Sequence, residues 1–380
     1  GENETIKAKL NLIIKNDSSY FCIKTILVSD LQFESKNCDV EKLSDLIRIP
    51  DLVGISNYIR KLNDESNLFF DSDIKVYKNN INKFLKSNLD LNRITLTKIK
   101  NQLFHTIVNI QSKDTSIASI VTERLHGISK TQLHYTALPN WKIEEDVISA
   151  QKFIIGKAKD EGFILDTYNH DWICKQSNTV VGSKLMPKLD SLKSAIFDIQ
   201  NILRELKRDE NSIVKFHNLY TYYTHLLISY SSGYRAVKNP FIGFENIDED
   251  TNSLIIRDKD GQDGYNTRLI YIPDQTIKQI KKYDEHRRYI LDKLCIFPDE
   301  IWNQDEVPFL FFIDEKFNIE TLRPKNILNI SEDYLHLPAN TNRRFIRSYL
   351  VANNIHPEFI DYFMGHWALG QEPWGRYSTL

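Results

Sequence analysis

Residues 340–366 read NTNRRFIRSYLVANNIHPEFIDYFMGH, and Arg376-Tyr377-Ser378-Thr379 follows near the end of the chain. Apolar residues recur at helical spacing from Thr341 to Ala352, which predicts a helix there. Arg343 and Arg347 are four residues apart, so they are expected to share one face of that helix. This helix and the short one after it are the most informative part of the chain, because candidate functional residues stand in order at their ends.

The second short helix is predicted to begin at Pro357, since proline is favoured in the first turn of a helix. Gly365 is expected to end it, because glycine readily adopts the left-handed conformation that closes helices. His366 follows at once, and Tyr377 lies further along. An arginine, a histidine and a tyrosine thus follow one another across two helix ends.

A further arginine lies upstream, in Ser232-Gly233-Tyr234-Arg235. The apolar stretch 213–230 predicts a buried helix that stops at this glycine. Arg235 is therefore expected just beyond the end of a rigid element. Two arginines can bind a phosphate through paired donors, and a tyrosine hydroxyl can attack it. These residues predict a site that cleaves a DNA strand.

The composition is that of a globular protein with real cores. The chain has 380 residues, of which 41% are hydrophobic and 26% charged, and this length favours more than one domain. The net charge of −2 argues against a protein that coats DNA by bulk charge, but it allows a local basic groove. No apolar run is long enough to span a bilayer. The four cysteines form no CxxC pair, so neither a metal site nor a disulfide framework is expected, and a reducing cytoplasm fits.

The patterns divide the chain into three parts. Residues 1–60 are a module of unknown role that begins with a predicted hairpin, residues 61–182 are mainly helical, and residues 183–380 contain the site. An irregular stretch, 170–188, contains glycine and proline and marks the second boundary. The expected fold class is mainly α with a small β-hairpin or sheet (α+β).

The last part is predicted in more detail. An amphipathic helix over about 192–206 precedes the buried helix 213–230. Two apolar runs flank a long, glycine-bearing turn within 253–273, which predicts a hairpin. Pro308–Ile313 is a short apolar segment for which periodicity leaves strand and helix open.

The ordered set of residues resembles the catalytic domain of the tyrosine recombinases, the lambda-integrase-like family. The family pattern is an arginine after a Thr-Gly-Leu turn, a lysine in a β-hairpin, His-x-x-Arg at a helix start, Leu-Gly-His, and a nucleophilic tyrosine. It is matched here by Ser232-Gly233-Tyr234-Arg235, Lys259, Asn340-Thr341-Asn342-Arg343, Met364-Gly365-His366 and Arg376-Tyr377-Ser378. The resemblance covers residues 185–380 and implies that residues 61–182 are a helical core DNA-binding domain.

The resemblance implies a transesterification that needs no metal or other cofactor. Tyr377 would attack a scissile phosphate and form a 3′-phosphotyrosyl bond. Arg235 and Arg343 would clamp the non-bridging oxygens, Lys259 would protonate the leaving 5′-oxygen, and His366 would hydrogen-bond the phosphate or assist the tyrosine. Further contacts with DNA are expected from four basic residues, Arg344, Arg347, Lys238 and Arg268.

Two positions depart from the family pattern. Asn340 stands where the family has a histidine, and an amide can orient a group but cannot take a proton at neutral pH. His336, four residues earlier, could fill that place in another register. Lys238 stands three residues after Arg235, at a position that is often acidic in the family.

The resemblance implies a site-specific DNA recombinase or integrase of the kind found in mobile genetic elements. Its expected partner is double-stranded DNA, on which it would act as a homodimer or homotetramer. Its expected place is the cytoplasm, associated with the nucleoid when bound to DNA, with no membrane contact. Three alternatives stay open: a catalytically weak or inactive DNA-binding protein on the same fold, a type IB topoisomerase-like enzyme, and a helical protein-interaction module.

Overall fold

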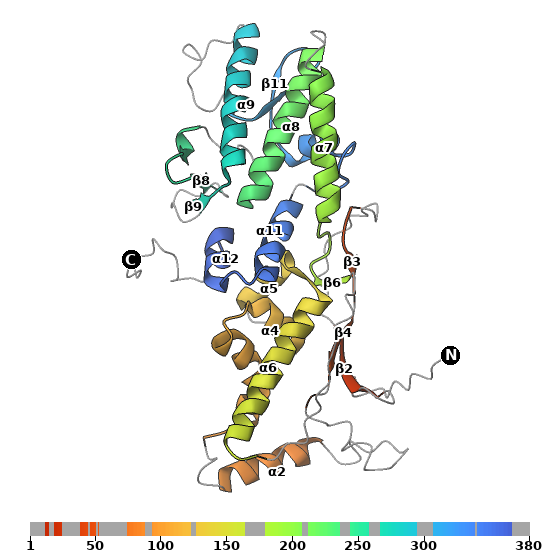
Figure 1. Cartoon of the computed structure of the whole chain (residues 1–380), viewed down its shortest axis with the longest axis vertical. Helices are drawn as coiled ribbons and strands as arrows, with labels where there is room; N and C mark the ends of the chain where they lie inside the picture. Colours follow the sequence, from red (N-terminus) through yellow and green to blue (C-terminus); the bar gives the residue numbers. More distant parts are fainter. Residues whose placement is uncertain are drawn as a thin grey trace, which may run out of the picture. The chain divides into compact units, whose positions relative to one another are not determined.

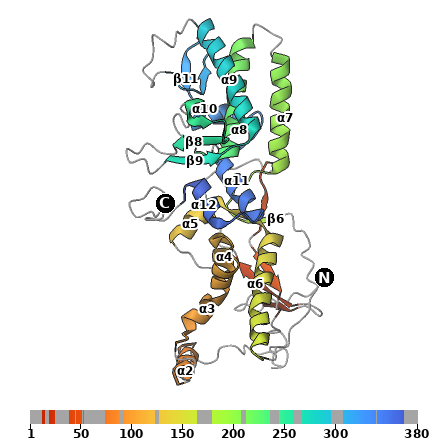
Figure 2. The same cartoon turned by 60° about the vertical axis from the view of Figure 1, so that its left-hand side comes forward.

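The computed structural model describes residues 12–14, 19–24, 39–44, 46–50, 52, 74–87, 93–122, 127–163, 179–206, 212–235, 244–257, 267–294, 307–338 and 340–366. Helices predominate among these residues, and the strands form small separate sheets (Figures 1 and 2). The mainly helical α+β fold class is therefore confirmed. No helix in the described part of the chain is long and apolar enough to cross a membrane.

The chain divides into two compact units. The first comprises Gly1–Leu27, Leu43–Ser129 and Leu138–Gly182. The second comprises Ser183–Leu380 together with Val28–Lys42 and Lys130–Ala137. The division of the sequence into three parts stays a prediction, and the short segment Lys130–Ala137 joins the unit that contains the candidate site.

The first unit combines helices with short strands. Its antiparallel sheet has the order β1-β2-β4, and β1 with β2 forms the hairpin expected at the start of the chain. The bounds of these strands are β1 Leu12–Ile14, β2 Ser19–Lys24 and β4 Leu46–Pro50. A second sheet, of order β3-β6-β5, joins β3 Lys42–Leu43, β6 Thr179–Gly182 and β5 Ala137–Pro139. The helices are α2 Ile74–Ser87, α3 Leu96–His105, a π-helical turn Thr106–Ile110, α4 Thr115–Thr122 and α6 Asn140–Asp160. A further helix, α5 (Gly127–Tyr135), begins in the first unit and continues into the segment Lys130–Ala137 of the second.

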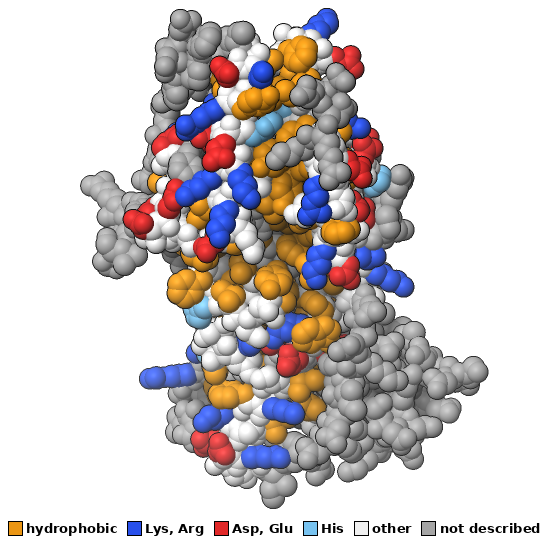
Figure 3. Space-filling model, turned by 45° about the horizontal axis from the view of Figure 1, so that its top comes forward, with side chains coloured by type: hydrophobic (Ala, Val, Ile, Leu, Met, Phe, Trp, Pro, Cys, Tyr) orange, Lys and Arg blue, Asp and Glu red, His pale blue; other side chains and the backbone are white. Residues whose placement is uncertain are grey.

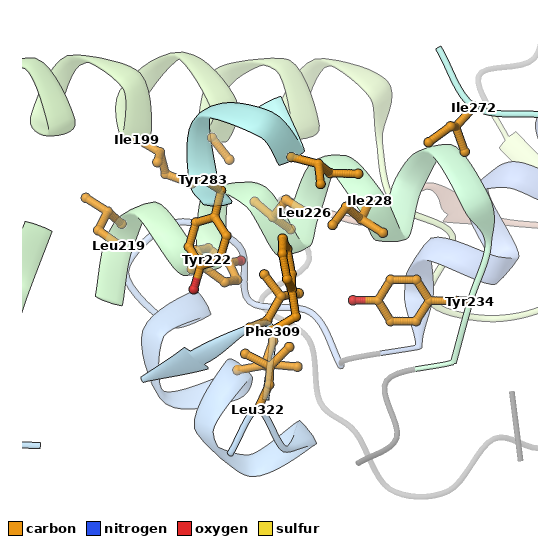
Figure 4. Close-up of a cluster of buried hydrophobic side chains, with 14 of the residues drawn as sticks. Ile199, Leu219, Tyr222, Leu226, Ile228, Tyr234, Ile272, Tyr283, Phe309 and Leu322 are labelled. Atoms are coloured by element: carbon orange, nitrogen blue, oxygen red, sulfur yellow. The ribbon is translucent and has the colours of Figure 1, made fainter. Parts of the chain in front are cut away.

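Three helices form the core of the second unit. They are α7 (Leu189–Leu206), α8 (Ile213–Ser232) and α9 (Asp274–Lys293), with α8 between the other two (Figures 1 and 2). The amphipathic helix and the buried helix are thus confirmed. Figure 4 shows the resulting cluster, in which Tyr222 and Tyr283 lie among aliphatic side chains and Phe309. Burying this apolar surface is the main stabilising contribution.

Within the segment Pro308–Ile313, only Phe311–Ile313 form a strand. β10 (Phe311–Ile313) pairs antiparallel with β11 (Ile319–Thr321), and α10 (Pro324–Ser331) follows. Asn218 on α8 fixes β10, because its amide donates to the oxygen of Ile313 and accepts from the nitrogen of the same residue, both at 2.8 Å. The side chain of Asn218 thus satisfies the backbone N–H and C=O groups of Ile313 at the end of this short strand.

The predicted hairpin is also confirmed. β8 (Ser253–Arg257) pairs antiparallel with β9 (Thr267–Tyr271), and β7 (Ile247–Asp248) extends the sheet in the order β7-β8-β9. Burial alternates along both long strands, as the period of two requires. In β9 the buried positions are Arg268 and Ile270. An arginine side chain thus lies on the inner face of this sheet.

The two helices of the opening stretch form where the sequence predicts them. α11 spans Thr341–Ala352 and α12 spans Pro357–Met364. Gly365 closes α12 in the left-handed conformation with φ 65°, and Gly233 closes α8 in the same way with φ 62°. A side chain at Gly233 would also approach Ile346 of α11 within 3.0 Å, so a glycine lets these two elements meet.

Candidate arginine–histidine site

The candidate site lies where four elements of the second unit end or meet. They are the C-terminal end of α8, strand β9, helix α11 and the C-terminal end of α12. Both helix ends carry carbonyl groups that have no partner within their own helix, and both carry the negative end of a helix dipole. Such a place favours cationic side chains.

Arg343 connects the two helix ends. Its Nη1 donates to the oxygen of Gly233 at 2.6 Å, and its Nη2 donates to the oxygen of Met364 at 2.7 Å. The same Nη2 lies 3.1 Å from Nε2 of His366. The side chain is 1% exposed. The structure thus brings together three of the predicted elements: the turn after α8, the first turn of α11, and Gly365-His366.

Arg268 approaches the same carbonyl groups from the sheet. It donates to the oxygens of Phe363 and Ser232, and its Nη2 donates to the oxygen of Gly233 at 3.2 Å. It was expected to contact DNA, and that role stays a prediction. Its side chain is only 1% exposed, and its described contacts hold the ends of α8 and α12 together.

Arg347 has a carboxylate partner. Its Nη1 donates to Oδ1 of Asp361 at 3.0 Å, and its Nε donates to Oγ1 of Thr136 at 2.9 Å. The amide of Gln132 donates to both oxygens of Asp361, at 3.1 and 2.9 Å. These contacts bind α11, α12 and the segment Lys130–Ala137 together. The expected contact of Arg347 with DNA is not tested by them and stays a prediction.

His366 is a neutral imidazole in this setting. Burial lowers its pKa to about 2, and the positive charges of four arginines lower it too: Arg343, Arg347, Arg235 and Arg268. A guanidinium group can only donate hydrogen bonds, so Nε2 must accept from Arg343 and the proton of the ring lies on Nδ1. Nδ1 is buried and has no hydrogen-bond partner among the described residues. The site therefore contains a buried N–H donor beside several positive charges.

We expect low pH to destabilise the fold through His366. The unfolded imidazole takes up a proton near pH 6.5, whereas the folded-state pKa is about 2, so between these values only the unfolded state binds the proton. The contribution to the free energy of unfolding therefore falls by roughly 1.4 kcal/mol for each pH unit below about 6.5.

Urea denaturation of the parent chain and of His366→Gln at pH 7 and at pH 5 measures this effect. The glutamine can still accept from Arg343 but does not titrate. The parent should lose about 2 kcal/mol more than the variant over this interval. Equal losses in the two chains would contradict the assignment of the low pKa to His366.

Arg235 and Asn340 lie at the edge of the site. Arg235 is half-buried directly after the turn that ends α8, and its charge acts on the pKa of His366. Asn342 holds this turn, because its amide donates to the oxygens of Ser229 and Tyr234 at 3.0 and 2.8 Å. Asn340 precedes α11 and is exposed, and its side chain makes no capping hydrogen bond to the helix.

The other predicted residues lie elsewhere in the second unit or outside the described part of the chain. Arg344 is 7% exposed, and its Nη2 lies 3.4 Å from Nε2 of His134. His336, the alternative to Asn340, has its Nδ1 3.7 Å from Oδ2 of Asp39. Three residues lie outside the described ranges: Lys238, Lys259 and Tyr377. Their roles stay predictions.

The sequence-based prediction missed the segment Lys130–Ala137. Tyr135 stacks on His366 with 5.3 Å between the ring centroids, and the guanidinium carbon of Arg343 lies 5.1 Å from the centroid of the same ring. The amide of Ala137 donates to Oγ of Ser348 at 2.8 Å. Nothing in the local sequence marks this segment, because its partners lie more than two hundred residues away.

A second basic surface lies in the first unit. Helices α2 and α3 contain several lysines but no aspartate or glutamate. The lysines with described, exposed side chains are Lys78, Lys83, Lys86, Lys98 and Lys100. Figure 3 shows basic and acidic side chains interspersed over the face that it draws, in keeping with the net charge of −2. The lysines of α2 and α3 are thus a local concentration of charge.

No group of histidine, cysteine, aspartate or glutamate in the described ranges could hold a metal ion.

No protein-family model and no curated protein matches the chain.

Solved structures of tyrosine recombinases are similar to the chain over most of its length. The crystal structure of XerA recombinase has 13% identity and a TM-score of 0.32, covering 86% of this chain and 93% of that chain. XerH recombinase bound to its difH substrate has 14% identity and a TM-score of 0.33, covering 90% and 86%. The Tn1549 transposon integrase with circular intermediate DNA has 10% identity and a TM-score of 0.33, covering 86% and 93%.

Proposed function

We propose that this chain is a DNA strand transferase of the tyrosine-recombinase kind, which cleaves and rejoins duplex DNA through a 3′-phosphotyrosyl bond. The observation that carries the proposal is the meeting of Arg343, Arg268 and His366 at the ends of α8 and α12. Nη2 of Arg343 lies 3.1 Å from Nε2 of His366, and both arginines donate to the oxygen of Gly233. A phosphodiester is the substrate that suits such a site, because it is an anion that gains charge on its non-bridging oxygens during attack.

The roles of the residues follow from their positions. Arg343 is fixed by two backbone carbonyls and Arg235 follows a rigid helix end, so both are suited to bind the phosphate with little reorganisation. His366 suits donation from Nδ1 to a non-bridging oxygen better than proton removal from a tyrosine, because its pKa of about 2 makes it a weak base.

The reaction would be completed by residues outside the described ranges. The phenol oxygen of Tyr377 would attack phosphorus while its proton passes to water, and the 5′-oxygen would leave with a proton from Lys259. Because the phosphotyrosyl bond retains the energy of the broken phosphodiester, rejoining needs no nucleotide. Asn340 would at most orient a group at the N-terminal end of α11.

The lysines of α2 and α3 support a role for the first unit in duplex binding. Side chains of this kind neutralise DNA phosphates and release counterions, so binding should weaken steeply as salt is added. The proposed assembly on DNA is a homodimer or homotetramer.

Recovery of protein-linked DNA tests the proposal without a known target. The chain is expressed in cells that carry its native flanking DNA, the cells are lysed in denaturant, and DNA that is covalently bound to the protein is sequenced. Adducts are expected from the parent and none from Tyr377→Phe, which lacks only the attacking oxygen. Adducts of equal yield from both chains would exclude Tyr377 as the nucleophile.

A catalytically silent DNA-binding protein on the same fold is the second candidate. The exposed Asn340 in place of the usual histidine favours it, since an amide cannot exchange protons with the reacting groups at neutral pH. Binding of duplex DNA without any adduct from the parent chain would support this candidate. Relaxation of supercoiled plasmid at many sites would instead indicate a topoisomerase-like activity.

A further inference from the structure

Tyr135 forms a closed triangle with two residues of the site. Its ring stacks on the imidazole of His366 with an interplanar angle of 27°, and Arg343 lies over the same ring. The third side of the triangle is the contact of 3.1 Å between Nη2 of Arg343 and Nε2 of His366. All three residues belong to the second unit.

The imidazole ring of His366 needs a stacking neighbour such as Tyr135 if it is to keep a single orientation. Among the described residues its side chain has one hydrogen-bond partner, Arg343, because Nδ1 has none. A ring held by a single hydrogen bond can still rotate about it. Stacking restricts this rotation, since offset aromatic pairs attract one another in preferred geometries.

The arginine is also restrained by the ring. Arg343 donates to the carbonyl oxygens of Gly233 and Met364, and the face of Tyr135 lies within the range of a cation–π interaction. The ring of Tyr135 thus contacts both Arg343 and His366.

Tyr135 itself is held firmly. Directly after it, Thr136 accepts from Nε of Arg347, and the amide of Ala137 donates to Ser348 on α11. Before it, the amide of Gln132 donates to both carboxylate oxygens of Asp361 on α12. These contacts fix the backbone on both sides of the ring against the two helices that carry the site.

We propose that Tyr135 is a positioning residue, which sets the orientation of the His366 ring and the Arg343 guanidinium for phosphate binding. The proposal rests on the proposed function where it concerns the reaction, but the orientation of His366 can be measured independently. The aromatic ring is the necessary part of the side chain, so phenylalanine should replace tyrosine and an aliphatic or amide side chain should not.

Two measurements on the full-length chain test this role. The first is the tautomer of His366 by NMR of histidine-labelled protein, with the signal assigned by its loss in His366→Gln. The second is single-turnover cleavage of the duplex recovered from the adducts, together with the Kd for that duplex. The variants are Tyr135→Phe, Tyr135→Leu and Tyr135→Gln, so that a folding defect in one aliphatic or amide variant leaves the other to decide. Tyr289→Leu is the matched control, since Tyr289 is 51% exposed on α9 with Lys293 over its ring.

Tyr135→Phe should keep a single Nδ1–H tautomer and the parental rate. Tyr135→Leu and Tyr135→Gln should show mixed tautomers and a cleavage rate lower by roughly 10²-fold, with the Kd unchanged. Tyr289→Leu should match the parent in both measurements. An unchanged His366 signal in the Leu and Gln variants would overturn the inference, as would cleavage at the parental rate.

The two proposals fail separately. If the His366 signal changes as expected but no chain forms an adduct, the positioning of His366 by Tyr135 stands and the proposed reaction falls. If the parent forms adducts and the Leu and Gln variants cleave as fast, the reaction stands and the role of Tyr135 falls.

Discussion

Replacing Arg343 by alanine is expected to abolish measurable strand cleavage and to lower the stability of the fold. The guanidinium group would supply paired donors to the phosphate, and loss of one such preorganised donor lowers a rate by roughly 10²- to 10³-fold. The same change removes a donor from the oxygens of Gly233 and Met364. Gly233 keeps its hydrogen bond from Arg268, so the cost is about 1–3 kcal/mol for the buried oxygen of Met364.

Arg343→Lys separates the two effects. A lysine keeps the positive charge but cannot bridge both carbonyls and a phosphate with a planar fork. Its stability should lie between those of the parent and the alanine variant, while cleavage should stay close to that of the alanine variant. Arg323→Ala, which removes an exposed arginine before α10, should change neither quantity.

The comparison is made by urea denaturation and by single-turnover cleavage at a temperature where every variant is folded. A folded Arg343→Ala chain that cleaves within tenfold of the parental rate would contradict the proposed phosphate contact. A variant as stable as the parent would contradict the structural role of the guanidinium group at the two helix ends.

The sequence predicts α11 and α12 well because their determinants are local. Apolar periodicity defines both helices, and Gly365 and Asn354 adopt the left-handed conformation that ends such helices. The same holds for α8, which stops at Gly233. Arg343 lies in the first turn of α11 and His366 directly follows Gly365, so local patterns place both residues at helix ends.

Arg268 shows where local patterns are insufficient. Strand β9 reads Thr-Arg-Leu-Ile-Tyr, so either face could be taken as the apolar one. In the structure Leu269 and Tyr271 are 42% and 62% exposed, and Arg268 is buried beside Ile270. The carbonyl groups at the ends of α8 and α12 decide the outcome, because they provide partners for a buried guanidinium group that no local pattern reveals.

Removing Asp361 is expected to have the second large effect, which is on stability. Asp361→Ala leaves Arg347, whose side chain is 0% exposed, without its carboxylate partner, and it also removes both acceptors of the Gln132 amide. Removing one partner of a fully buried ion pair costs about 3–5 kcal/mol, because the remaining charge is poorly solvated. The Asp361 side chain is 26% exposed, so a cost near the lower end of this range is expected. The free energy of unfolding should fall by this amount in urea denaturation.

A surface pair provides the matched control. Arg288 and Asp284 on α9 are closer together, at 2.7 Å, but the Arg288 side chain is 75% exposed. Water and salt screen such a pair, so Arg288→Met should cost at most about 1 kcal/mol. The burial of the charges, and not the distance between them, should therefore determine which substitution lowers the free energy of unfolding more. Equal costs for Arg288→Met and Asp361→Ala would contradict this explanation.

The double variant Arg347→Met/Asp361→Leu distinguishes a structural arginine from one that binds DNA. Replacing both charges by apolar groups removes the unpaired cation, so most of the stability lost in Asp361→Ala should return. If Arg347 serves the fold alone, this double variant binds duplex DNA with the Kd and the salt dependence of the parent. A salt dependence that is weaker by about one phosphate contact would instead assign Arg347 to the DNA interface.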